Sequence, residues 1–110
     1  MIKTVGLLTR KHDWTHEQFM KHWVDIHAPL AHAVPGIRRY VQNHILGERK
    51  RPDVDETAIE IDGVAELWFD DRAAMEKAMK TSEMQALQAD GARFIGRIKS
   101  FIVEELIVIG

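Results

Sequence analysis

The residues best suited to chemistry are two histidines and a tyrosine that flank one short connection. His27 lies at the end of a predicted amphipathic helix, and Pro35-Gly36 marks a turn before the strand that carries Tyr40 and His44. An imidazole exchanges a proton near neutral pH and a phenol donates a hydrogen bond, so together they suit an acid/base pocket. The alternative for His27 is a structural histidine that bonds the last carbonyls of its helix.

Polar side chains on the predicted strand extend this pocket. Tyr40, Gln42 and His44 alternate with apolar residues, so they share one strand face. We expect the apolar face to pack on helices and the polar face to line a wet cavity. In the preceding helix, Trp23 lies four residues before His27, and we expect it to contact the substrate.

Glu66 is a carboxylate inside the otherwise apolar strand Val64–Phe69. Such a group must be paired, protonated or functional when both sheet faces are covered. We expect it to face the cavity with a raised pKa and to assist His27; a salt bridge to Arg38 or Arg39 is the alternative. Trp68 shares its face and is either core or a flat wall for a ligand.

Metal and cofactor sites are not expected. The sequence has no cysteine, and its six histidines do not form an HExxH pattern. It also lacks a glycine-rich phosphate loop and a dinucleotide-binding fingerprint, which disfavours nucleotide cofactors. We therefore predict chemistry without a metal or cofactor.

Bulk composition restricts the possible partners. The chain has 110 residues, 45% of them hydrophobic, which is enough for one domain, residues 1–110, with a single core. The formal net charge of −2 provides no basic field for nucleic acid. No stretch has membrane-spanning length and the first ten residues do not resemble a signal peptide, so we expect a cytoplasmic protein.

The order of predicted elements is β-α-β-β-α-β, a ferredoxin-like α+β fold with a four-stranded antiparallel sheet. Thr15 with Gln18 predicts a capping box, and Pro29 predicts a break or kink near residues 27–29. Asp70-Asp71 and Ser82 are predicted to cap the later helices. The strands are predicted at residues 2–9, from 37, at 64–69 and at 101–109. The charged residues 48–61 are predicted to form a mobile loop at the cavity mouth.

One sheet face carries no helix in this arrangement. Because the strands are apolar on both sides, we expect a second copy to cover that face. The result would be a face-to-face homodimer, a dimeric α+β barrel, that encloses the binding cavity between two sheets.

The chain also resembles the EthD-domain family. The resemblance rests on Lys11–Phe19, His22-Trp23, His27–Leu30 and Pro35–Tyr40, and on the later segments Gly63–Phe69 and Phe101–Glu105. It implies the same dimeric α+β barrel. The family includes accessory proteins of ether-degrading oxygenases, cofactor-free lactone isomerases, and relatives that act as dehydratases or cyclases.

Two functions follow as hypotheses. The first is a small cofactor-independent catabolic enzyme (an isomerase, dehydratase or monooxygenase) that acts on an apolar carbonyl-bearing aromatic or lactone compound. His27, Tyr40 and Glu66 would be catalytic, while Trp23, Gln42, His44 and Trp68 would bind the substrate. The second is a non-catalytic accessory protein that holds an apolar ligand in the same cavity.

Overall fold

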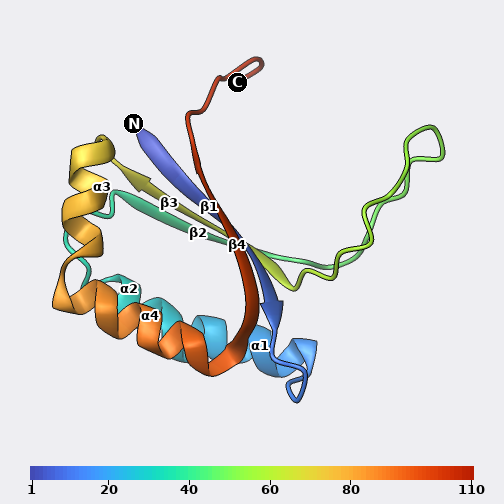
Figure 1. Cartoon of the computed structure of the whole chain (residues 1–110), viewed down its shortest axis with the longest axis horizontal. Coiled ribbons are helices and arrows are strands. Elements are labelled where there is room, and N and C mark those ends of the chain that lie inside the picture. The colour runs from blue at the N-terminus through green and yellow to red at the C-terminus, as the bar shows by residue number, and fades with distance from the viewer.

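The computed structural model describes all residues, Met1–Gly110, as one sheet with helices on one of its faces (Figure 1). The antiparallel strands lie in the order β2-β3-β1-β4, which confirms the ferredoxin-like prediction. Along the chain the elements are β1 (Ile2–Arg10), α1 (His16–His22), η1 (Trp23–His27), α2 (Ala28–Ala31), β2 (Arg39–His44), β3 (Gly63–Phe69), α3 (Arg72–Met79), α4 (Ser82–Phe94) and β4 (Ile95–Val103).

Side-chain caps fix where the helices begin. The predicted capping box is present: Thr15 Oγ1 accepts from the Gln18 backbone N–H at 3.1 Å, and Gln18 Oε1 accepts from the Thr15 N–H at 2.8 Å. Asp71 caps α3 as predicted. The start of α4 was predicted one residue late, because Thr81, not Ser82, accepts the hydrogen bond from Met84 N.

The helix is irregular near residues 27–29, as predicted, but it is not interrupted. The chain stays helical through a single wide π-turn, η1, in which the Ala28 N–H bonds the Trp23 carbonyl. This turn accommodates Pro29, which has no N–H to donate, near the start of α2. The wide turn also changes which side chain faces the core: His27 is buried, whereas Ile26, three residues after the buried Trp23, is 49% exposed.

The last strand begins earlier than predicted. β4 follows α4 directly and pairs with β1, with Leu8 opposite Ile98 and Lys3 opposite Val103. Strand β1 begins at Ile2, beside the end of β4, so the predicted continuation of the last strand to residue 109 has no neighbouring strand to pair with. The apolar residues Leu106–Ile109 therefore lie outside the sheet and are exposed.

Strand register decides which residues share a sheet face. Tyr40 lies opposite Leu67, and Leu67 lies opposite Thr4; this row faces the helices. The next row, containing Glu66 opposite Val5, faces away from them. Two buried clusters fill the helix side, one around Phe69 and Met84 and one around Trp23 and Phe94.

Residues 46–61 form an arm that extends away from the sheet (Figure 1). Its base is held by Asp62, which is 2% exposed and accepts hydrogen bonds from the Arg10 backbone N–H, the Arg10 guanidinium and His16. Burial opposes ionisation, but these bonds hold the pKa of Asp62 below its usual value. None of the helices is both long and apolar enough to cross a membrane.

Candidate active site

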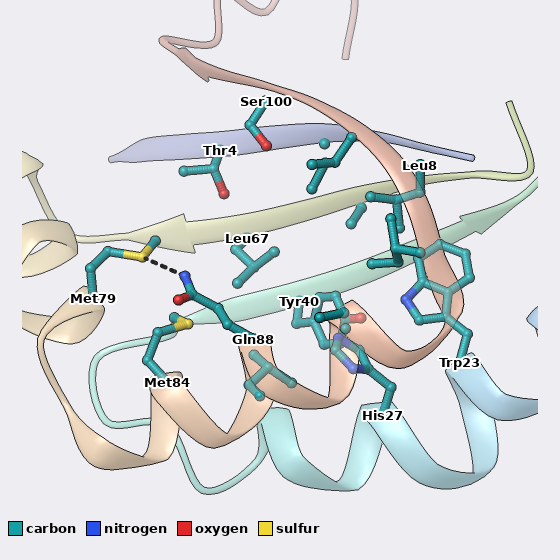
Figure 2. Close-up of a pocket in the computed structure, with 17 residues that line it drawn as sticks. Thr4, Leu8, Trp23, His27, Tyr40, Leu67, Met79, Met84, Gln88 and Ser100 are labelled. Carbon is teal, nitrogen blue, oxygen red and sulfur yellow. Dashed lines mark hydrogen bonds between the residues drawn. The ribbon is translucent and has the colours of Figure 1, made fainter. Parts of the chain in front are cut away.

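A cavity of about 500 Å³ lies between the sheet and the helices of a single chain (Figure 2). Its floor is the helix-facing side of the sheet, where Thr4, Gly6 and Ala65 are too small to fill the space. Its opposite wall comes from η1 and α4. This pocket is distinct from the cavity predicted between the sheets of two copies, because it lies on the helix side of a single chain, where small residues leave the space.

His27 lines this cavity from η1 and is 8% exposed. Its Nδ1 lies 2.8 Å from Oδ2 of Asp90, a residue of α4 that is 5% exposed. A carboxylate only accepts, so Nδ1 carries the proton and Nε2 is left as the free basic nitrogen of the neutral ring. Burial lowers the pKa of His27 below its ordinary 6.5, and the bond to Asp90 opposes this only partly.

Asp90 is the functional residue that the sequence reading missed. It also accepts from His22 Nε2, at 3.0 and 3.1 Å, and Arg93 lies 3.7 Å away. The available signal was positional: Asp90 falls three residues after Leu87 and four before Phe94, on the buried face of α4. An acidic residue on an apolar helix face needs a partner, and two histidines supply it.

Tyr40 lines the same cavity from β2, as Figure 2 shows. Its oxygen accepts a hydrogen bond from Gln42 Nε2 at 3.0 Å, which leaves the hydroxyl hydrogen free to donate. Burial raises the pKa of Tyr40 above 10.0, although the hydrogen bond from Gln42 partly opposes the shift. At neutral pH the phenol therefore keeps its proton and acts as a donor.

Gln42 and His44 do not line the cavity; they contact residues that do. Gln42 Nε2 also donates to the Trp23 carbonyl at 2.9 Å, and its Oε1 lies 3.0 Å from His44 Nε2. The polar strand face was predicted to point away from the helices, but it points toward them. The small cavity-floor residues provide the room that those polar side chains need.

Trp23 is fully buried and lines the cavity. Its ring lies 4.8 Å from that of His44, and it packs directly over Gly63, where a Cβ atom would overlap the indole. Gly63 is thus required for a close approach, and it fixes Trp23 beside His27 and Tyr40.

Glu66 does not join these residues, contrary to expectation. It lies on the helix-free face, where Lys3 Nζ donates to it at 2.6 Å and Asn43 Nδ2 at 2.8 Å. These two bonds lower the pKa of Glu66, so the predicted raised pKa is wrong. The arginine alternative is also wrong: Arg38 pairs with Asp70.

Trp68 is also absent from the cavity. It packs on the helix-free face between Lys3 and Arg39, each 4.7 Å from its ring centroid, and its Nε1 donates to Glu105. The loop predicted at the cavity mouth, residues 48–61 of the arm, does not border the cavity. Residues 58–61 line a separate hollow on the helix-free side. The described side chains include no cluster of three or more histidine, aspartate or glutamate residues arranged to hold a metal ion.

Comparison with known proteins gives three similarities. The chain is 30% identical over 108 residues, 97% of its length and 100% of the relative, to a protein of Pseudomonas reinekei named 4-carboxymethyl-4-methylbutenolide mutase. A crystal structure of an EthD family protein from Bacillus halodurans has a TM-score of 0.77 and 28% identity, with 96% of this chain and 99% of that chain covered. A dimeric ferredoxin-like protein of Thermobifida fusca has a TM-score of 0.65 and 16% identity, with 93% and 88% covered.

The family model for the EthD domain matches residues 11–98. This range contains η1, β2 and α4, the elements that carry His27, Tyr40 and Asp90. With most of the chain matched, the protein belongs to the EthD domain family.

Proposed function

We propose that this protein is a cofactor-independent isomerase that moves a proton within a small lactone. The observation that carries the proposal is a buried neutral histidine, oriented by Asp90, in an apolar cavity that also holds a phenol donor. The mutase name of the Pseudomonas reinekei relative supports the reaction class and the lactone ring.

In the proposed mechanism His27 is the general base. Its Nε2 removes a proton from the carbon beside the lactone carbonyl, and the developing enolate oxygen accepts a hydrogen bond from Tyr40. The imidazolium then returns the proton to another carbon of the same molecule. Asp90 stabilises the imidazolium while it exists, and no electrons leave the substrate.

The accessory-protein alternative receives less support from the geometry. A ligand-holding cavity needs no oriented base, whereas His27 bonds a buried carboxylate rather than the carbonyls of its own helix. We therefore place the ligand-binding role second. Lyase and oxidoreductase chemistry gain no such support, because the Pseudomonas reinekei relative is named a mutase.

The activity is tested with α-angelica lactone, whose ring CH₂ lies beside its carbonyl and whose double bond can migrate into conjugation. Proton NMR in D₂O follows both isomer formation and deuterium uptake. We expect turnover by the natural chain, and loss of about 10²–10⁴-fold in His27→Gln. The exposed His32 provides the control variant His32→Gln, which should keep full activity.

Tyr40→Phe is the second variant for this assay. It removes the hydroxyl and keeps the ring, so we expect turnover to fall while the fold persists. Unchanged turnover in both His27→Gln and Tyr40→Phe would exclude the mechanism.

We further propose a homodimer. Phe101 on the helix-free side and the tail residues 106–109 expose large apolar side chains that a second copy would cover. The Thermobifida fusca protein of similar fold is described as dimeric. Analytical ultracentrifugation at micromolar concentration tests this, and a single species of monomer mass would contradict it.

A further inference from the structure

The indole N–H of Trp23 is a buried side-chain donor without a hydrogen-bond partner. Trp23 is 0% exposed, and its ring is one wall of the cavity. Buried donors are nearly always paired, because an unpaired donor has lost its hydrogen bonds to water without forming one to the protein. A bound molecule with an oxygen acceptor would complete the hydrogen bonding of Trp23 Nε1.

The position of this donor is fixed by its surroundings. Phe19 packs 5.5 Å from the Trp23 ring and His44 packs 4.8 Å from it, while Gly63 lies directly beneath. In Figure 2 the nitrogen edge of the indole points toward Tyr40 and His27, not toward the helix behind it. The ring cannot turn its N–H elsewhere without displacing these neighbours.

The Tyr40 hydroxyl provides a second donor at the same end of the cavity. Its oxygen already accepts from Gln42, so its hydrogen is available to a ligand. Two neutral donors and the free Nε2 of His27, which line the same cavity, match a carbonyl oxygen and the C–H beside it.

The cavity offers no side chain with a permanent positive charge to pair with an anion. Its 17 lining residues include no lysine and no arginine. Lys3 is engaged with Glu66 on the other sheet face. The buried ionisable group behind His27 is Asp90, an acid. A carboxylate placed here would lose its water without gaining a cation.

We infer that Trp23 Nε1 and the Tyr40 hydroxyl jointly bind the carbonyl oxygen of an uncharged lactone or related carbonyl compound, and that carboxylate-bearing analogues are disfavoured. This inference rests on the proposed function and specifies its substrate class. It separates this chain from the Pseudomonas reinekei relative, whose name contains a carboxymethyl group.

The test uses two probes that differ in one charge: 4-carboxymethyl-4-methylbutenolide and its methyl ester. Binding is measured by calorimetry, and the indole N–H resonances are followed in protein labelled with ¹⁵N. We expect the ester to bind about tenfold more tightly or better. It should shift the Trp23 N–H resonance, while Trp68, whose N–H is bonded to Glu105, serves as the internal control.

Each other outcome has a defined meaning. If the acid binds as tightly as the ester, or if the Trp23 resonance does not move, this inference is overturned even while α-angelica lactone is turned over. If neither probe binds at millimolar concentration and α-angelica lactone is not isomerised, the proposed lactone function fails and the inference fails with it. Trp23→Phe, checked for folding by circular dichroism, should weaken binding of the ester, because it removes one of the two donors to the carbonyl oxygen, while the preference for the ester over the acid should remain.

Discussion

His27 and Asp90 form a buried hydrogen-bonded pair across two helical elements, with Nδ1 of one 2.8 Å from Oδ2 of the other. The residues are 63 positions apart in the chain. The carboxylate assigns the ring proton to Nδ1 and keeps Nε2 free, which is the arrangement that the proposed general base requires. This pair and the contacts around the site lead to the five predictions below.

Asp90→Asn should lower turnover of α-angelica lactone by about 10–10²-fold, since the amide keeps the shape but not the charge that stabilises the imidazolium. Steady-state kinetics should show the loss in kcat rather than in KM. Asp25→Asn provides the control, because Asp25 is half exposed and pairs only with Lys21 on the helix surface. Equal effects of the two substitutions would contradict the assigned role of Asp90.

The pH dependence of kcat/KM should show an acid limb below the ordinary histidine pKa of 6.5, because burial lowers the pKa of His27 and the neutral ring is the base. Activity should be level between about pH 7 and 8. Asp90→Asn should move the limb lower still, since Asp90 raises the pKa that burial depresses. A limb above pH 6.5 would show that His27 is not the titrating base.

The free energy of unfolding should also decrease at acidic pH, as the activity does. The unfolded chain binds a proton to His27 at about pH 6.5, whereas the folded chain does so only at lower pH. The unfolded state therefore holds more protons within that window, and the free energy of unfolding should decrease as the pH falls through it. Urea unfolding at several pH values should show a smaller decrease for His27→Gln.

Glu66→Gln should leave turnover unchanged, because Glu66 lies on the helix-free face and pairs with Lys3. Its pKa is lowered by Lys3 and Asn43, so the pairing stabilises the fold above the ordinary pKa of 4.5 and is lost as the pH falls below it. We expect a loss of about 0.5–1 kcal/mol at pH 7, measured by urea unfolding. A fall in kcat would return Glu66 to the catalytic set.

Gly91→Ala should stabilise the protein and impair its activity. A Cβ at Gly91 in α4 would lie 3.6 Å from His27 Cε1, an ordinary contact without a clash. Replacing a glycine within a helix stabilises it by about 0.5–1 kcal/mol. The added methyl group narrows the cavity beside His27, so KM should rise. Thermal unfolding and kinetics measured on one preparation would separate the two effects.

Local patterns in the sequence were sufficient for the elements and their order. Thr15 with Gln18 specifies a helix start through hydrogen bonds three residues apart, and Asp71 does the same for α3. The period-two alternation from Tyr40 to His44 likewise specifies a strand with two distinct faces. Such signals depend on near neighbours, so the chain carries them without reference to the fold.

Only the tertiary structure decided which face of each strand packs on the helices and which distant side chains come into contact. Alternation groups Tyr40 with Gln42 but does not say whether that group meets helices or solvent; the register with β3 and β1 settles this. Glu66 found its cation, Lys3, on β1, two strands away from Tyr40. The acid that orients His27 comes from α4, 63 positions along the chain. These contacts join residues distant in the chain, and no local pattern encodes them.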